Sequence, residues 1–271
     1  MVVQHNVTAM NANRQLGITT GVQAKSSEKL SSGYKINRAA DDAAGLAISE
    51  KMRRQVRGLT QASANAQDGI SLAQTAEGAL NEVHDMLQRM NELANKAANG
   101  TLTSEDRSYI NQEVSALISE IDRTANDTKF NDKSLLSADA TFTLQVGADS
   151  GQTISVSTKK MNSTGLGVSG ATVTGTDATN ANSALAAIKS GITTLSSMRA
   201  DLGAVQNRLE HTVKNLDNVV ENTQAAESLI RDTDMAKEMV KYSNNNILAQ
   251  AGQSMLAQAN QSNQGVLSLL G

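Results

Sequence analysis

A long stretch between Ser183 and Ile230 carries one helical period without interruption. Residues that recur every three or four positions share one face of a helix. Written as a heptad, the stretch has its apolar a and d positions at Leu185, Ile188, Ile192, Leu195, Leu202, Leu209, Val213, Leu216, Val220 and Ile230. At the rise of an α-helix it would span roughly 72 Å. A helix this long cannot bury its apolar stripe against itself, so a second long helix must lie alongside it.

The partner is predicted near the other end of the chain, between Leu46 and Ala97, where apolar residues again alternate at four and three positions. This stretch would span roughly 78 Å, close to the length of the first. We expect Asn99-Gly100 to end it through a left-handed residue. A third helix should begin at Thr103, where Asp106 three residues later is close to a capping box.

Between residues 126 and 182 the pattern changes. Thr141–Val146 and Thr153–Val156 alternate with a period of two around a glycine-containing turn, which predicts a β-hairpin at about 141–157 with one apolar face on the bundle. Residues 162–182 are mostly Gly, Ser, Thr, Asn and Ala. We interpret that segment as a short exposed loop that tolerates insertion.

The two chain ends have sparse helical seams and few charges. Residues 2–32 and 231–271 are rich in Asn, Gln, Ser and Thr, and helices of this kind are marginal in isolation. They could pair with each other and still leave poorly solvated surface. Copies of the chain could cover that surface through head-to-tail contacts that do not close, as in a filament. An ordinary coiled-coil scaffold with frayed ends explains the pattern equally well.

Composition supports long helices over a globular core. The chain has no Pro, Cys or Trp and two Phe, whereas an average chain of this length has about 14 prolines. The net charge of −3, with both signs interspersed, argues against nucleic acid as a partner. No apolar run approaches the ~20 residues of a membrane span, and the N-terminus lacks the pattern of a signal peptide. We therefore expect no membrane partner, and export, if any, by another route.

The sequence offers no convincing catalytic, cofactor or metal site. His5, His84 and His211 lie far apart without ligand spacing, and phosphate-binding glycine loops are absent. Asp41 and Asp42 are adjacent and cannot face each other on a helix, so a capping or interface role is favoured over acid-base work. We predict a protein that is not an enzyme and has no cofactor.

Several long segments resemble bacterial flagellins. They are LSSGYKINRAADDAAGLAISEKMR (30–53), AQDGISLAQTAEGALNEVHDMLQRMNELANKAANGT (66–101), FNDKSLL (130–136), LQVGADSGQTI (144–154), DLGAVQNRLEHTVKNL (201–216) and ILAQAGQSMLAQANQSNQGVLSLLG (247–271). The resemblance implies a subunit that polymerises with itself into the extracellular flagellar filament of swimming bacteria. It also implies passage through the flagellar type III export apparatus, a C-terminal export chaperone, and folding under a filament cap.

The same resemblance implies an architecture. Residues 1–45 with 231–271 would form a helical inner-tube domain of paired chain termini, and residues 46–230 a rod-shaped outer-tube domain, a long antiparallel helical bundle with the β-hairpin. A short exposed loop at residues 162–182 would stand in place of the variable domains of longer relatives. We expect packing between copies at Val3, Val7, Met10, Asn37, Arg38, Asp41, Asp42, Ile247, Ala251, Met255, Leu267 and Leu270.

Flagellins are also recognised by a Toll-like receptor of animal hosts, and Arg89, Leu93 and Glu113 match the family positions for that contact. Asn91 departs from the pattern, because many recognised relatives carry a second basic residue there. Without a receptor, Arg89 and Glu113 would form an exposed ion pair worth under ~1 kcal/mol. Alternatives to a filament subunit are a hook-filament junction protein and a cytosolic coiled-coil adaptor.

Overall fold

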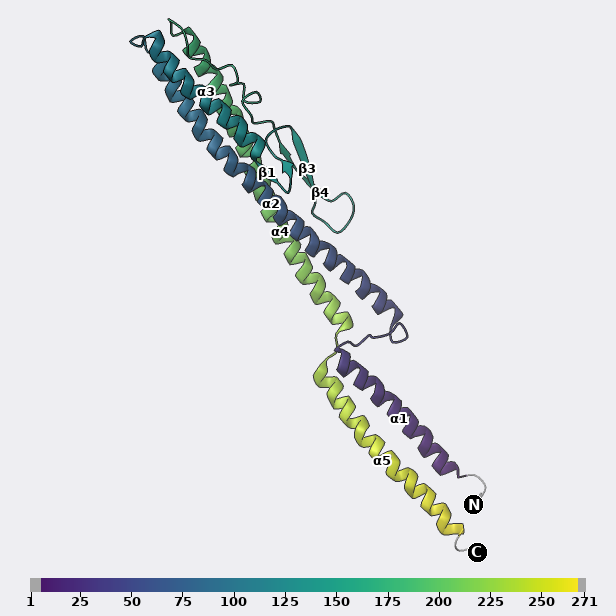
Figure 1. Cartoon of the computed structure of the whole chain (residues 1–271). Coiled ribbons are helices and arrows are strands. Elements are labelled where there is room, and N and C mark those ends of the chain that lie inside the picture. Colours follow the sequence, from purple (N-terminus) through teal and green to yellow (C-terminus); the bar gives the residue numbers. More distant parts are fainter. Residues whose placement is uncertain (1–5, 268–271) are drawn as a thin grey trace. The chain divides into compact units, whose positions relative to one another are not determined.

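The chain divides into two compact units in a computed structural model that describes the backbone of residues 6–267 and the side chains of residues 6–262. The terminal unit comprises residues 1–54 and 222–271, and the central unit comprises residues 55–221. Along the described residues the elements are α1 (Val7–Ser32), α2 (Ala43–Ala97), α3 (Ser104–Asp127), β1 (Lys129–Phe130), β2 (Lys133–Ser134), β3 (Ala140–Gln145), β4 (Thr153–Thr158), α4 (Thr179–Arg231) and α5 (Met235–Leu267) (Figure 1).

The predicted fold class, mainly α with a small β-hairpin, is confirmed. The two long helices predicted over 46–97 and 183–230 extend by a few residues to Ala43–Ala97 and Thr179–Arg231. Both helices contribute residues to both units, so the units divide within α2 and α4. The sequence-based boundaries at 45/46 and 230/231 lie instead near helix ends.

The core of the central unit lies where α2, α3 and α4 pack side by side (Figure 1). Each helix contributes its apolar stripe, and the side chains without solvent exposure include Leu80, Leu87, Met90, Val114, Ile121, Ile188, Leu195 and Leu209. Full burial of such a side chain contributes about 1.5–3 kcal/mol. The heptad positions that the sequence marked therefore form the seam of a three-helix bundle.

The turn between α2 and α3 contains the predicted N-terminal cap of α3. It does not contain the left-handed residue that was predicted to end α2. The Thr103 side chain accepts a hydrogen bond from the Asp106 amide at 3.2 Å, and the Asp106 carboxylate accepts one from the Thr103 amide at 3.0 Å. This is a complete capping box. The expectation of a left-handed residue at Asn99-Gly100 is wrong, because neither residue has a positive φ. Turn hydrogen bonds, such as Asn99 N–H to the Lys96 carbonyl at 3.2 Å, end α2 instead.

The β3–β4 hairpin packs on α2 at two glycines, Gly58, which lies against Ala148 in the hairpin turn, and Gly69. Its apolar face pairs Phe142 with Val156 and Leu144 with Ile154, and Val156 is fully buried. A Cβ on Gly69 would collide with the Leu144 side chain. The Asn65 side-chain amide also donates to the Gln145 carbonyl at 2.9 Å. The hairpin is therefore part of the central core, as its single apolar face requires.

The segment 162–182 has no helix or strand before Thr179 and many exposed residues, as predicted for a loop, but it is also anchored in the core, which was not predicted. Leu166, Val168 and Val173 are at most 3% exposed and belong to the central core, and the last residues of the segment already begin α4. Side chains of α3 accept hydrogen bonds from the backbone of this segment. The Asp122 carboxylate accepts one from the Ser163 amide at 2.8 Å, and the Asn111 side-chain oxygen accepts one from the Val173 amide at 3.0 Å. The small residues that suggested a loop let the backbone approach the helices closely, as at Gly191, which lies against Leu166.

The terminal unit contains a two-helix pair of α1 and α5. Asn6 caps α1 and also donates from its side chain to the Ala259 carbonyl of α5 at 3.0 Å. Gly33 ends α1 in the left-handed conformation, with φ of 74°, where residues other than glycine are strained. Ile36 is the only hydrophobic residue of the described part of this unit that is buried. Two helices alone thus leave most of their apolar side chains in contact with solvent.

Candidate functional site

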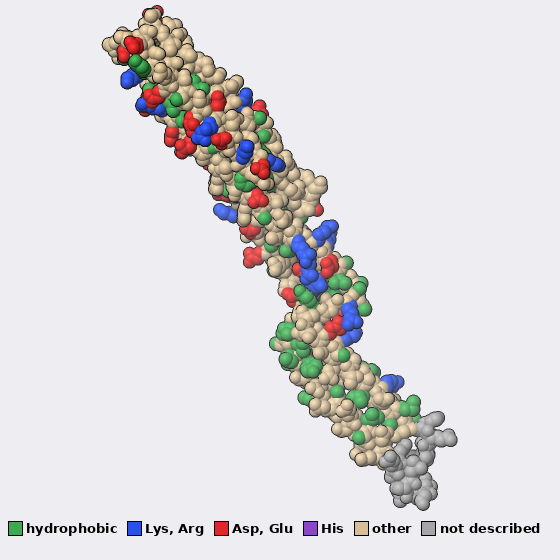
Figure 2. All heavy atoms as spheres, viewed as in Figure 1, with side chains coloured by type: hydrophobic (Ala, Val, Ile, Leu, Met, Phe, Trp, Pro, Cys, Tyr) green, Lys and Arg blue, Asp and Glu red, His purple; other side chains and the backbone are tan. Residues whose placement is uncertain are grey.

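The most unusual surface of the molecule is apolar and almost uncharged. Among the described residues, every large hydrophobic side chain that is exposed, apart from Tyr109, belongs to the terminal unit. We call the members on α1 and α5 the apolar terminal surface: Val7, Met10, Ile18, Met235, Met239, Val240, Ile247, Leu248 and Met255. On the face shown in Figure 2, hydrophobic side chains gather over these helices, where charged side chains are few.

The exposed fractions on this surface are large. Met10 is 66% exposed, Ile247 64% and Met255 65%. No Asp, Glu, Lys or Arg occurs after Lys241, and Arg14 is the only such residue before Lys25. Contiguous apolar surface without charge marks an interaction site in a protein that is otherwise well packed.

Four of the twelve packing residues expected from the sequence belong to this surface, and a fifth, Ala251, lies on the same helix α5. Val7, Met10, Ile247, Ala251 and Met255 are all exposed. Val3 and Leu270 lie outside the described residues, and so does the side chain of Leu267. Sequence reasoning did not select Ile18, Met239, Val240 or Leu248. Ile18 lies on α1 and the other three lie on α5. Both helices are only weakly amphipathic, so the spacing of apolar residues did not indicate which face is exposed.

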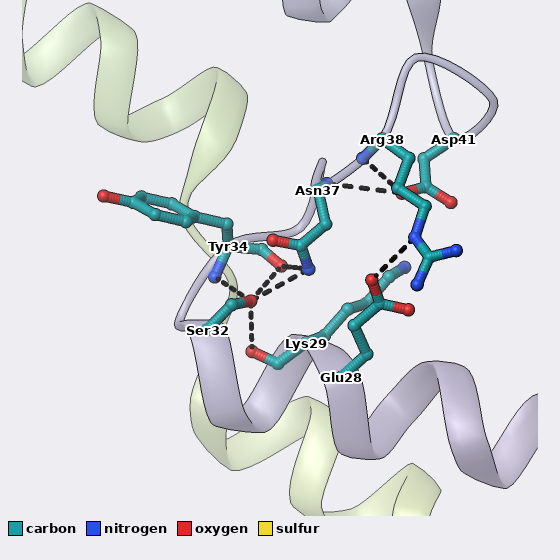
Figure 3. Close-up of polar contacts among 7 residues, drawn as sticks. All are labelled: Glu28, Lys29, Ser32, Tyr34, Asn37, Arg38 and Asp41. Atoms are coloured by element: carbon teal, nitrogen blue, oxygen red, sulfur yellow. Dashed lines mark hydrogen bonds and ion pairs between the residues drawn. The ribbon is translucent and has the colours of Figure 1, made fainter.

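The remaining predicted packing residues form the loop between α1 and α2 (Figure 3). The Asp41 carboxylate accepts hydrogen bonds from the backbone amides of Asn37 at 3.2 Å and Arg38 at 3.0 Å. These bonds, that from Arg38 first, lower the pKa of Asp41 below its ordinary value. Asp42 accepts from the Gly45 amide at 2.9 Å, at the start of α2. Both carboxylates are thus engaged in fixing the loop backbone.

The loop is also held to the helix that precedes it. The Arg38 Nε donates to the Glu28 carboxylate of α1 at 3.0 Å, and the Asn37 side-chain amide donates to the Ser32 hydroxyl at 2.8 Å (Figure 3). The Arg38 and Glu28 side chains are 73% and 38% exposed, so their ion pair contributes little by itself. Hydrogen bonds to backbone give this loop its single shape, with Arg38 projecting from it.

A second cluster in the terminal unit centres on Tyr34. The Arg231 guanidinium lies 4.8 Å from the centre of the Tyr34 ring and the Arg53 guanidinium lies 6.0 Å from it, both within range for a cation–π contact. Arg231 also pairs with Glu50 at 2.9 Å. At this point two chain segments are joined by backbone hydrogen bonds, in which the Lys35 amide donates to the Arg231 carbonyl and the Thr233 amide donates to the Gly33 carbonyl.

Sequence reasoning missed this cluster. Its members, Tyr34, Arg53 and Arg231, are far apart in the sequence, and no local spacing connects them. The available signal was the rarity of aromatic residues, since the chain has three Tyr and two Phe. An aromatic residue retained in such a composition, directly after a helix-ending glycine, indicates a packing role.

The predicted receptor-contact residues are brought together on α2 and α3. Arg89 Nη2 lies 2.9 Å from the Glu113 carboxylate and Arg89 Nη1 lies 3.1 Å from that of Glu92. The hydrogen bond that Arg89 donates to Glu113, followed by the one it donates to Glu92, raises the pKa of Arg89. The Arg89 and Glu113 side chains are about half exposed, whereas Leu93 is 4% exposed and packs in the core. A groove beside them is also lined by Lys96, Tyr109 and Ile110.

Chemistry for catalysis or metal binding does not emerge from the described residues. Within them, no group of three or more His, Asp or Glu side chains lies close enough to hold a metal ion. His84 sits on the bundle seam with its Nε2 3.0 Å from Gln88 Nε2. None of the helices, over the same part of the chain, is long and apolar enough to cross a membrane.

Comparison with known proteins identifies the family. Residues 3–141 match the bacterial flagellin N-terminal helical region and residues 185–270 match the C-terminal helical region. The chain is 55% identical to a flagellin of Halalkalibacterium halodurans, with all of both chains covered. It is 50% identical to the flagellar filament 31.3 kDa core protein of Treponema maltophilum and 48% to a flagellin of Bacillus subtilis, again over all of both chains. The chain belongs to the bacterial flagellin family.

A crystal structure of Bacillus cereus flagellin is 28% identical, with 56% of this chain and 88% of that chain covered and a TM-score of 0.48. Flagellins are structural proteins, and this flagellin is a subunit of the extracellular flagellar filament that drives swimming. The predicted function as a filament subunit is confirmed, and the matches favour it over a hook-filament junction protein or a cytosolic adaptor.

Proposed function

We propose that this flagellin polymerises chiefly through the apolar terminal surface, which becomes buried between copies of the chain. The single observation that carries the proposal is the confinement of exposed large hydrophobic side chains to the terminal unit, Tyr109 excepted. Burying apolar surface contributes about 25 cal/mol per Å². Because α1 before Lys25 carries only Arg14 and α5 after Lys241 carries no charged residue, little desolvation of charged groups opposes that gain over those parts of the surface.

The extent of the apolar terminal surface supports an open polymer. It is spread along both α1 and α5, from Val7 to Met255. A patch that contacts a different patch on the next copy generates a helical array when the rotation does not close. We therefore assign the terminal unit to the inner tube of the filament and the central unit to the outer tube. The loop at Asn37–Asp42 would add polar contacts between copies through the exposed Arg38.

A pair of charge substitutions with similar exposure tests this proposal. Leu248 lies on the apolar terminal surface and is 57% exposed, and Tyr109 lies on the central unit and is 61% exposed. We expect Leu248→Asp to block seeded polymerisation, because a buried unpaired carboxylate costs several kcal/mol. Tyr109→Asp should polymerise. Both are measured by sedimentation and electron microscopy, with circular dichroism to verify the monomers. Equal polymer yield from the two variants would overturn the proposal.

The family also suggests how the subunit reaches the filament. We infer passage through the flagellar export apparatus, help from an export chaperone at the C-terminal region, and addition under the filament cap. The chain has no cysteine, so no disulfide prevents it from being exported unfolded. The sparse core of the terminal unit also makes that unit easy to unfold. Its role is structural, and we propose no catalytic activity.

Recognition by a host Toll-like receptor is a second candidate function, favoured by the exposed Arg89–Glu113 pair beside the groove on α2 and α3. An Arg that already lies in a fixed geometry presents its donors with less loss of side-chain entropy. We expect Arg89→Ala to reduce receptor activation in a reporter assay. Arg123→Ala is the matched control, since Arg123 is also an exposed, doubly paired arginine on α3. Equal activation by both variants would contradict this role.

A further inference from the structure

The turn between α2 and α3 holds the single Asn-Gly dipeptide of the chain, Asn99-Gly100. Both residues are exposed and lie outside the helices. The Asn99 side-chain oxygen accepts a hydrogen bond from the Thr101 amide at 3.3 Å. This bond defines an Asx-turn. Because Asn99 directly precedes Gly100, attack of the Gly100 nitrogen on the Asn99 side-chain carbon closes a five-membered ring. The Gly100 amide donates no hydrogen bond to any of the described residues, so its nitrogen is available to react.

Arg107 binds the carbonyl oxygen of the same Asn99–Gly100 peptide group. Its guanidinium is 2% exposed and donates to the carbonyl of Asn99 at 3.1 Å. It also donates to the carbonyls of Ala97, Gly175 and Thr176, and no carboxylate in the described part of the chain pairs with it. A buried cation on a carbonyl oxygen stabilises negative charge on that peptide unit. The Gly100 N–H is the proton whose loss creates such charge.

We propose that Asn99 is a site of spontaneous deamidation in the folded protein and that Arg107 promotes the reaction. The Gly100 nitrogen gives its proton to water and attacks the Asn99 side-chain carbon. A new C–N bond forms, the bond to the side-chain nitrogen breaks, and ammonia leaves with a proton from water. The resulting five-membered succinimide then adds water at either carbonyl and opens to aspartate or isoaspartate. The net reaction consumes one water, releases one ammonia and changes no oxidation state.

The fold protects the one Asp-Gly dipeptide of the chain. Asp68-Gly69 could form the same succinimide, with loss of water, but it lies inside α2. There the Gly69 amide belongs to the helix ladder, and Gly69 is buried against the hairpin. The Asp68 site therefore serves as an internal comparison that should stay unmodified in the native protein.

Deamidation changes the charge and the geometry of the turn. The product places a carboxylate at the C-terminal end of α2, where the helix dipole disfavours negative charge, and close to Arg107. Isoaspartate also adds a methylene to the main chain, which displaces the carbonyl that Arg107 holds. Because the filament is extracellular, cytoplasmic repair does not reach it. The modified fraction therefore records the age of a subunit.

The site is tested by incubating purified full-length protein at neutral pH. Peptide mass spectrometry and an isoaspartate methyltransferase assay then report the product at residues 99 and 68. Gly100→Ala is a clean variant, because a Cβ there meets nothing within 4 Å and φ is not positive. We expect product at residue 99 alone, and Gly100→Ala to slow it by at least about tenfold. A stable Asn99, or equal rates in the two proteins, would overturn the assignment.

The contribution of Arg107 needs a separate comparison. If Arg107 promotes the reaction, the native wild-type protein modifies Asn99 faster than the same chain unfolded in urea, because only the fold brings Arg107 to the Asn99 carbonyl. Arg107→Lys should lose part of that acceleration while leaving the urea rate unchanged. Should Arg107→Lys fail to fold, the native and unfolded wild-type rates still decide. A native rate equal to or below the unfolded rate would exclude promotion by Arg107.

Discussion

The central and terminal units are both built from long helices, yet they treat apolar side chains in opposite ways. The buried hydrophobic residues of the described chain lie in the central unit, with Ile36 as the exception, and the exposed large ones lie in the terminal unit, with Tyr109 as the exception. Three helices and a hairpin enclose a core between them, whereas two helices can only cover one stripe of each other. The central unit therefore encloses its own core, and we propose that other copies of the chain complete the terminal unit.

Truncation of the chain ends should give the largest difference between the two units. Removal of residues 1–32 or 245–271 deletes α1 or the second half of α5 and should abolish polymerisation. The central unit should keep its helical signal and its resistance to protease, because its core uses none of these residues. Polymer yield is measured by sedimentation and the central unit by limited proteolysis. Normal filaments from either truncated chain would show that the terminal unit is not required.

Matched leucine substitutions should show the same contrast in monomer stability. Leu202 is 1% exposed in the central unit, and Leu229 is 85% exposed in the terminal unit. Leu202→Ala should lower the free energy of unfolding by about 2–5 kcal/mol through the lost burial and the cavity. Leu229→Ala should change it by less than about 0.5 kcal/mol. Urea unfolding of the monomers measures both, and similar losses would mean that Leu229 is covered in the monomer.

The Tyr34 cluster should be the most stable point of an otherwise weakly packed unit. Tyr34→Ala removes the ring that Arg231 and Arg53 contact, an interaction of about 0.5–2 kcal/mol. We expect faster hydrogen exchange at the Lys35 and Thr233 amides, which join the chain segments at this point. Exchange in the core of α2 should not change. Unaltered protection of Lys35 and Thr233 would show that the backbone bonds suffice.

The smallest expected effect concerns the capping box of α3. Thr103→Ala should cost about 0.5–2 kcal/mol in unfolding free energy at neutral pH. Hydrogen bonds from the Thr103 amide, then from its hydroxyl, lower the pKa of Asp106 below its ordinary value of 3.8. The ionised form of Asp106 therefore stabilises the fold above that value, and the contribution is lost as the pH falls through the lowered pKa. Acid titration of unfolding should show the difference between wild type and variant shrinking, because only the wild type has the hydroxyl bond to the ionised Asp106 carboxylate, and a constant difference would contradict the assignment.

Elements with a local cause were predictable. The bundle helices follow from a repeat of apolar residues that any neighbour would bury, and the cap at Thr103 and Asp106 needs residues only three positions apart. The docking of residues 162–182 was not predictable, because it depends on Asp122 and on the space beside Gly191. The Tyr34 cluster and the Arg107 contacts were missed for the same reason, since their partners lie far along the chain.

The sequence by itself determined the long helices, the hairpin, the uncharged chain ends and the family. These properties depend on residue order over a few turns of chain, where periodicity and composition act directly. The tertiary structure decided which apolar residues are covered and which remain exposed. That outcome depends on how many elements meet at each place, because an apolar stripe is buried only where another element lies against it.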